Sequence, residues 1–205
     1  MLHTKDKLSN SEQVLSLART QGFVRPADLS RLHIPRVYLH RLYERGVLQR
    51  SGRGMYSLSE TAPTETAALA EICHRIPAGV VCLLSALRFH GIGTQNPFEV
   101  WVAIDSKARR PNIDYPPVRI ARFSGISLAE GVEEHPTNLG PIRVYSPAKT
   151  VVDCFRYRNK IGLDVALEAL REARHDKKAT IDEIWHYAKL LRVSSAIRPY
   201  LDSLS

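Results

Sequence analysis

The chain has little cysteine, no long apolar run and no leader-like N-terminus. Its three cysteines, Cys73, Cys82 and Cys154, are odd in number and widely spaced, so we expect buried thiols rather than a disulfide framework. They lack the close ligand pairs that zinc sites use, so no metal is expected. No apolar run approaches the roughly 18 residues of a transmembrane helix, and "MLHTKDKLSN" has no signal-peptide core. We therefore expect a cytoplasmic protein without membrane contact.

Positive charge, by contrast, is abundant and concentrated in one segment. The 205 residues carry a formal net charge of +8 at pH 7. Residues 19–53 hold eight arginines, no lysine and only two acidic residues, so this segment accounts for three quarters of the net charge. Such a cluster indicates an anionic partner, most simply nucleic acid.

Three short helices are predicted in this N-terminal part. "SNSEQVLSLART" begins with Ser9-x-x-Glu12, which is a capping-box pattern, and continues with helical periodicity. Pro26 opens a second helix, and Pro35 opens a third that ends at Gly46, a left-handed C-terminal position. Two short helices joined by the tight turn "HIP" are typical of a helix-turn-helix.

The third helix is predicted to have two different faces. At about 100° per residue, the side expected to face the core carries Pro35, Leu39, Leu42 and Tyr43. The opposite side mixes cationic, acidic and apolar residues, which suits base edges, because arginine can pair with guanine, glutamate with cytosine and valine with a thymine methyl. Taken alone, an ordinary amphipathic surface helix is the alternative. The residues of this helix expected to contact DNA are Arg36, Val37, Tyr38, His40, Arg41, Glu44 and Arg45.

Two short apolar runs follow the helix directly. "GVLQR" and "GMYSL" have the composition of strands and are joined by a Ser-Gly-Arg-Gly turn, which predicts a tight hairpin. A hairpin after a reading helix is a wing, and we expect Arg50 and Arg53 near its tip to contact the phosphate backbone. Residues 1–60 are therefore predicted to form a winged helix-turn-helix DNA-binding domain.

The polar stretch "SETAPTE" predicts a linker to a second domain, residues 66–205. Strands are expected in "FEVWVAID", "PVRIARFS" and "IRVYS", because these segments are rich in β-branched and aromatic residues. Helices are expected in "TETAALAEICHRIP", in "VVCLLSALRFHGI" and in four segments from "SPAKTVVDCFRYRN" onward. The fold class of the chain is therefore α+β, with a mixed α+β C-terminal domain.

The segment "GFVRPADLSRLHIPRVYLHRLYERGVLQRSGRGMYSL" resembles the N-terminal domain of the AbiEi family, the antitoxin and transcriptional-regulator half of abortive-infection toxin–antitoxin pairs. The resemblance rests on Phe23, "ADLSRL", "YLHRLYERG" and "GRGMY". It continues through "VVCLLSALRFHGI", a strand with Trp101 and "VYSPAKTVVDCFRY", and so covers about residues 9–200. It implies operator binding by both halves and antitoxin action of the C-terminal half against a nucleotidyltransferase-like toxin.

Signs of catalysis are few. Ser85 lacks the Gly-x-Ser-x-Gly elbow of a hydrolase, and no glycine-rich loop has phosphate-binding spacing, so no cofactor is expected. Asp105-Ser106-Lys107 matches half of a metal-dependent nuclease pattern, but a second carboxylate is missing at a natural place. We therefore expect no enzyme and no catalytic residue; a nuclease-like or DNA-processing enzyme with a winged-helix targeting module is the alternative.

The function predicted from the sequence is that of a sequence-specific DNA-binding transcriptional regulator. It would be the antitoxin of an AbiE-like system that represses its own operon. The expected partners are double-stranded operator DNA and, from the resemblance, the toxin. A monomer and a homodimer on DNA both remain open.

Overall fold

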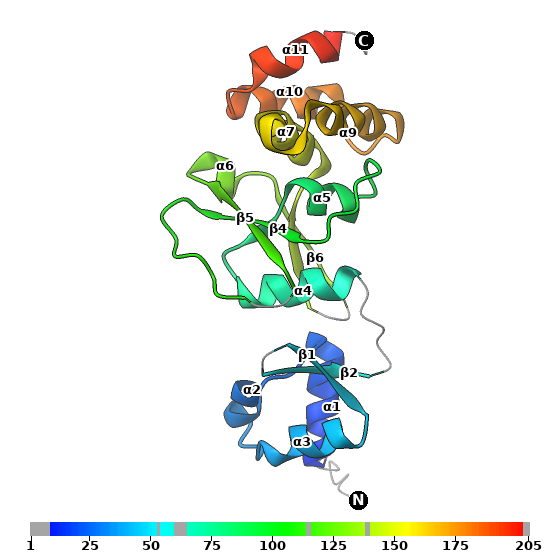
Figure 1. Cartoon of the computed structure of the whole chain (residues 1–205), viewed down its shortest axis with the longest axis vertical. Coiled ribbons are helices and arrows are strands. Elements are labelled where there is room, and N and C mark those ends of the chain that lie inside the picture. The colour runs from blue at the N-terminus through cyan, green and yellow to red at the C-terminus, as the bar shows by residue number, and fades with distance from the viewer. Residues whose placement is uncertain (1–8, 53, 60–64, 114–115, 138–139, 203–205) are drawn as a thin grey trace, which may run out of the picture. The chain divides into compact units, whose positions relative to one another are not determined.

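The computed structural model describes residues 9–52, 54–59, 65–113, 116–137 and 140–202. Contacts between residues divide the chain into two compact units. The first unit comprises Met1–His74 and Pro136–Pro141, and the second comprises Arg75–His135 and Ile142–Ser205. Figure 1 follows their helices and strands in chain order. The domain boundaries at residues 60 and 66 stay a prediction, since residues 60–64 lie outside the described residues.

The first unit opens with helix α1 (Asn10–Gln21), whose start confirms the predicted capping box. The backbone N–H of Glu12 donates to the Ser9 hydroxyl at 3.2 Å, and the backbone N–H of Ser9 donates to the Glu12 carboxylate at 2.7 Å. Two N–H groups that have no partner inside the helix are thereby satisfied. These hydrogen bonds lower the pKa of Glu12 below its usual value.

Helix α2 (Pro26–Arg31) is joined to helix α3 (Val37–Glu44) by a turn centred on His33. The backbone N–H of His33 donates to Ser30 O at 3.2 Å, and that of Ile34 donates to Leu29 O at 2.9 Å. These bonds form a Schellman motif, which needs a left-handed residue after the helix. His33 takes that position with φ of 56°, where glycine is usual. The turn therefore fixes the direction in which α3 leaves α2.

The hairpin predicted after α3 is confirmed. Gly46, with φ of 70°, ends α3 in the left-handed conformation, and strand β1 (Leu48–Gly52) pairs with strand β2 (Met55–Leu58) in antiparallel fashion. The pairing contains a bulge between Arg50 and Gly52. Val24 extends the ladder with two backbone hydrogen bonds to Tyr56, at 2.8 and 3.0 Å. The hairpin is thus fastened to the segment between α1 and α2.

A small apolar core holds these elements together. It is formed by Val14, Ala18, Val24, Leu29, Ile34, Leu39, Leu42 and Leu48, each at most 4% exposed. The expectation that α3 turns its leucines inward is confirmed for Leu39 and Leu42. It is wrong for Pro35, which is exposed, and for Tyr43, which is 45% exposed. Helix α4 (Glu65–Arg75) follows the hairpin.

The second unit is built on a mixed five-stranded sheet with the order β5-β4-β3-β7-β6. Its strands are β3 (Val80–Val81), β4 (Val100–Asp105), β5 (Val118–Phe123), β6 (Val132–His135) and β7 (Ile142–Tyr145). β4 runs parallel to β5, and β3 parallel to β7. The β3–β4 and β6–β7 pairs are antiparallel. This mixed sheet with helices confirms the predicted α+β class.

Helices α7 (Pro147–Arg156), α9 (Leu163–His175), α10 (Ile181–Leu190) and α11 (Ser194–Asp202) gather on one side of this sheet (Figure 1). Helix α7 is central, because it contacts α5 (Leu83–Phe89), α9, α10 and α11. The short helices α6 (Ile126–Ala129) and α8 (Arg158–Ile161) complete the unit. None of the described helices combines the length and the apolar character needed to cross a membrane.

Two details of the second unit differ from the sequence-based expectation. The segment "VVCLLSALRFHGI" was expected to be helical throughout, but Val80 and Val81 form strand β3 and the helix begins at Leu83. Leu83 has φ of 48°, which breaks the periodicity between strand and helix. Strand β6 was not predicted, because "VEEH" has the composition of a charged surface segment. It lies at the edge of the sheet, where charged strands are common.

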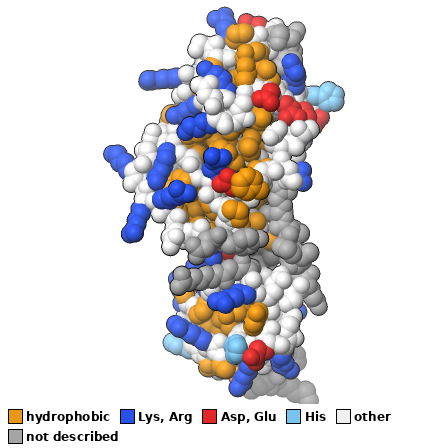
Figure 2. Space-filling view, in the orientation of Figure 1, with side chains coloured by type: hydrophobic (Ala, Val, Ile, Leu, Met, Phe, Trp, Pro, Cys, Tyr) orange, Lys and Arg blue, Asp and Glu red, His pale blue; other side chains and the backbone are white. Residues whose placement is uncertain are grey.

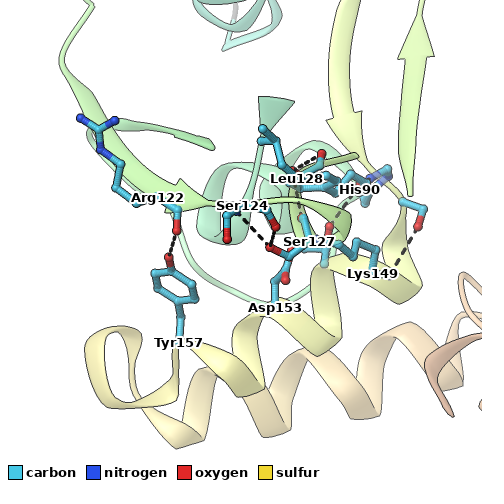
Figure 3. A network of polar contacts seen from close by, with 11 residues as sticks. His90, Arg122, Ser124, Ser127, Leu128, Lys149, Asp153 and Tyr157 are labelled. Atoms are coloured by element: carbon cyan, nitrogen blue, oxygen red, sulfur yellow. Dashed lines mark hydrogen bonds and ion pairs between the residues drawn. The ribbon is translucent and has the colours of Figure 1, made fainter. Parts of the chain in front are cut away.

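A charged pair lies in the interior of the second unit (Figure 3). Lys149 and Asp153, one turn apart on α7, form an ion pair with both side chains fully buried. The Lys149 Nζ also lies 3.7 Å from the centroid of the Tyr145 ring, a cation–π contact. Burial raises the pKa of Asp153 to about 6 and lowers that of Lys149, while each charge partly offsets the shift of the other.

Candidate nucleic-acid interface

The predicted reading face of α3 lies on the surface of the first unit. Leu39 and Leu42 are 2% and 3% exposed, which fixes the opposite side of the helix outward. Val37, an apolar residue, is 45% exposed. The charged residues predicted to contact DNA on this helix and at its two caps, Arg36, His40, Arg41, Glu44 and Arg45, are all exposed. The helix therefore presents cationic, acidic and apolar groups together.

An ion pair organises part of this face. The His40 Nε2 lies 3.0 Å from the Glu44 Oε1, one turn further along the helix, and both side chains are more than 60% exposed. Exposed pairs of this kind add little stability, on the order of 0.3–0.5 kcal/mol. The consequence is geometric: the imidazole and the carboxylate lie side by side on the outward side of α3.

Tyr38 has a different position from the other predicted contact residues. Its ring is half-buried and packs against the apolar core of the first unit. The Arg41 guanidinium carbon lies 5.6 Å from the centroid of that ring, within the range of a cation–π interaction. Tyr38 is therefore suited to position Arg41, whereas its own role as a DNA contact stays a prediction.

Strand β1 of the hairpin, which carries Arg50, contacts α3. Arg50 is exposed and pairs with Tyr56 across the β1–β2 ladder. The Tyr56 ring packs edge-on against Tyr43 of α3, with ring centroids 6.0 Å apart and an interplanar angle of 73°. Arg53, the second cation predicted at the tip, lies outside the described residues.

Sequence reasoning missed Tyr43, because it assigned this residue to the core. At about 100° per residue, Tyr43 lies at the edge between the buried and exposed sides of α3, so periodicity alone does not decide its environment. The environment of Tyr43 is set by the hairpin, whose Tyr56 ring packs against it while the residue stays 45% exposed. A usable signal was the repeated tyrosine in "LYERG" and "GMYSL", one on each neighbouring element.

The nuclease-like residues lie at a turn of the second unit. The Asp105 carboxylate accepts from the backbone N–H of Lys107 at 2.8 Å, and Arg122 donates to the Asp105 carbonyl at 2.9 Å. The Arg122 carbonyl in turn accepts from the Tyr157 hydroxyl at 3.2 Å (Figure 3). Within the described ranges, no group of three His, Cys, Asp or Glu side chains is arranged to hold a metal ion. The Asp105 carboxylate is thus occupied in closing its own turn.

The cysteines are free and buried, as expected. Burial raises the pKa of Cys82 and of Cys154 well above the usual thiol value. Both thiols therefore stay protonated at neutral pH, which is the unreactive form.

On the visible face of the protein, basic side chains are spread over both units, and carboxylates are fewer (Figure 2).

Comparison with known proteins gives the class of the first unit. Residues 12–59 match the family described as "Transcriptional regulator, AbiEi antitoxin", so the resemblance drawn from the sequence is confirmed for this segment. The match runs from the first turn of α1 to the end of β2 and includes every residue predicted to contact DNA.

A solved structure extends the likeness to both units. The crystal structure of the RV2827C protein from Mycobacterium tuberculosis is similar over 89% of this chain and 72% of that chain, with a TM-score of 0.59 and 13% sequence identity. At this identity the similarity is one of fold. No curated protein matches the chain.

Proposed function

We propose that this chain is a sequence-specific DNA-binding transcriptional regulator whose first unit acts as a winged helix-turn-helix. In this proposal α2 and α3 are the helix-turn-helix, α3 is the reading helix, and β1 with β2 is the wing. The observation that carries it is the outward face of α3, where Val37, Arg41 and the His40–Glu44 pair stand opposite two buried leucines. The family match of residues 12–59 to transcriptional regulators supports it independently.

The dimensions of α3 agree with this role. An α-helix with its side chains is about 10–12 Å in diameter, and a major groove about 12 Å wide admits it; the eight residues of α3 give about two turns to lie along the groove. With α3 in the groove, a hairpin beside it faces the sugar-phosphate backbone, where an exposed arginine such as Arg50 binds without reading sequence. Specificity then depends on the α3 side chains and affinity on both elements.

We also propose that the chain is an antitoxin that represses its own operon, with a nucleotidyltransferase-like toxin encoded beside it. The support is the description of the matching family, which joins antitoxin and regulator in one protein. Co-expression with the adjacent gene would test the antitoxin role. Growth arrest by that gene should be relieved by this chain, and no relief would contradict the proposal.

The test of DNA binding is a fluorescence-anisotropy titration of the full chain. One duplex is taken from the region upstream of its own gene, and the other has the same composition in scrambled order. We expect tighter binding to the first, by about 10³-fold or more at physiological salt. Equal affinity for both duplexes would contradict sequence-specific reading. Arg171→Ala, which removes an exposed arginine from α9, is the control for the loss of one charge and should bind like wild type.

We propose further that the chain is not a nuclease. The Asp105 carboxylate closes a turn by accepting from the backbone N–H of Lys107. Asp105→Ala should therefore change this turn, and it should abolish no DNA cleavage because none is expected. Plasmid incubated with the purified chain and Mg²⁺ or Mn²⁺ should stay supercoiled. Nicking by the wild-type chain that disappears in the Asp105 variant would favour the DNA-processing alternative.

A further inference from the structure

We propose that Tyr43 is a DNA-binding residue whose hydroxyl donates a hydrogen bond to a backbone phosphate between the reading helix and the wing. This inference rests on the proposed DNA-binding function. It adds to the interface a residue that the helical period had assigned to the core. It follows from the exposure of Tyr43, from its packing partner and from the arginines carried by the helix start and the hairpin.

The Tyr43 side chain is open to solvent. An aromatic side chain at the edge of a buried helix face usually packs most of its surface against neighbouring residues. Tyr43 is instead 45% exposed, although Leu39 and Leu42 on the same helix are almost fully buried. Among the residues that the structure describes, none makes a hydrogen bond to the Tyr43 hydroxyl. The phenol group is therefore available as a donor at the surface.

The ring is nevertheless held in place. Tyr56 of β2 packs edge-on against it at a centroid distance of 6.0 Å, and Tyr56 itself rests against the apolar core. Two backbone hydrogen bonds to Val24 fix the Tyr56 backbone. A donor on a supported ring loses less conformational entropy on binding than one on a long flexible side chain.

Arginines lie at the start of α3 and on the hairpin that packs against Tyr43. Around the helix axis, Tyr43 lies about 20° from Arg36, which is the N-cap of α3 about 10 Å earlier along the axis, and about 60° from His40, which pairs with Glu44. On the hairpin, Arg50 is directly opposite Tyr56 in the antiparallel ladder. Directly opposite residues project on the same face of the ladder, so Arg50 projects on the face that carries the Tyr56 ring. Tyr43 thus shares one side of the helix with Arg36 and contacts Tyr56, whose cross-strand neighbour is Arg50.

A phosphate is the group that satisfies this arrangement. Phosphate oxygens accept hydrogen bonds from a tyrosine hydroxyl and attract arginines such as Arg36 and Arg50. Tyrosine is among the side chains that contact DNA phosphates. A base edge fits less well, because Tyr43 is displaced from the centre of the reading face toward the hairpin. The contact would fix how deeply α3 enters the groove without specifying a base.

The experiment compares Tyr43→Phe with wild type in the same anisotropy titration, at several salt concentrations. The variant keeps the ring and its packing on Tyr56 and removes the hydroxyl alone. We expect affinity to fall about tenfold on both the upstream and the scrambled duplex, as for loss of a hydrogen bond to a charged group. The slope of log affinity against log salt should not change, because no cation is lost. Tyr187→Phe on α10 is the matched control and should bind like wild type.

A second measurement identifies the phosphate. A methylphosphonate, which carries no charge, replaces each backbone phosphate near the predicted contact in turn. At one position the wild type should weaken and the difference between wild type and Tyr43→Phe should vanish. Unchanged affinity of the variant, a loss confined to the upstream duplex, or a difference that persists at every position would each overturn the inference.

The outcomes separate this inference from the proposed function. Equal binding of wild type to both duplexes would contradict sequence-specific reading, yet the Tyr43 comparison would still give an answer, because a phosphate contact requires no base preference. Specific binding by wild type with an unaffected Tyr43→Phe would refute the Tyr43 contact alone. No binding of wild type to any duplex would refute both.

Discussion

The buried Lys149–Asp153 pair makes a strong prediction about the stability of the second unit. Both side chains are fully buried, and Lys149 is further surrounded by the Tyr145 and Phe123 rings. In Lys149→Met the apolar stem is kept and the ammonium is lost, so the Asp153 carboxylate remains buried without its cation. Breaking a buried pair in this way costs about 3–5 kcal/mol. For a unit of this size we expect the melting temperature to fall by on the order of 10–20 °C.

The pH dependence of this loss has a definite sign. Asp153 already has a pKa of about 6, above the value of 3.8 that applies when it is exposed, and removal of Lys149 raises the folded-state pKa further. A carboxyl whose pKa is raised on folding binds a proton more tightly in the folded state, so the free energy of unfolding decreases as pH rises from about 4 through the folded pKa. The deficit of Lys149→Met relative to wild type should therefore be larger at pH 8 than at pH 5.

Thermal and urea unfolding, followed by circular dichroism at pH 5 and pH 8, measure both effects. Lys107→Met removes an exposed lysine of the same unit and should melt like wild type. The double variant Lys149→Met/Asp153→Leu removes both charges, and we expect it to recover most of the lost stability, because an apolar replacement of a buried pair is often neutral or stabilising. A single variant that melts within about 3 °C of wild type at both pH values would refute the reasoning.

Three further predictions concern the first unit. Arg41→Ala should weaken binding to the upstream duplex by about 1–3 kcal/mol and relax preference at one base pair; an equal loss on scrambled DNA, seen by anisotropy, would reduce Arg41 to a phosphate contact. Arg50→Ala and Arg53→Ala should each weaken binding to all sequences and make the salt slope shallower by about 0.9; an unchanged slope would contradict the wing. His33→Gly should raise the free energy of unfolding by about 0.5–1 kcal/mol. Removing the Cβ relieves about 1–2 kcal/mol of strain at this left-handed position, and the greater chain entropy that glycine loses on folding offsets part of that gain. Urea unfolding measures the change, and a decrease would contradict this account of the turn.

Local chemistry made much of the first unit predictable. The Ser9–Glu12 capping box lies within four residues of sequence, and the bonds that it forms are the ones the pattern predicts. Gly46 ends α3 because a residue without a Cβ adopts the left-handed conformation freely. The hairpin followed from strand-like runs on both sides of a glycine-containing turn. Each of these features depends on neighbours in the chain, and none requires knowledge of the tertiary fold.

Features that depend on distant neighbours were less accessible. Lys149 and Asp153 are spaced four apart, as surface ion pairs on helices commonly are. Sequence therefore favours exposure for them, and only the packing of α5, α9, α10 and α11 around α7 buries the pair. Strand β6 is defined by its pairing with β7 and has little intrinsic preference for a strand.

The candidate interface combines both kinds of feature. Periodicity identified the charged outward residues and Val37 correctly, because Leu39 and Leu42 mark the inner side of α3, but it misassigned Pro35 and Tyr43 to the core. It did not distinguish residues that touch a ligand from residues that support them. Tyr38 and Tyr43 lie on opposite flanks of the helix, and each is assigned by a neighbour: Arg41 stacks on the first, and the Tyr56 ring packs against the second. On this helix, therefore, the Tyr38 ring supports the Arg41 guanidinium, and the Tyr56 ring supports the Tyr43 phenol. Which residue can contact DNA depends on this tertiary packing, and the helical period alone does not reveal it.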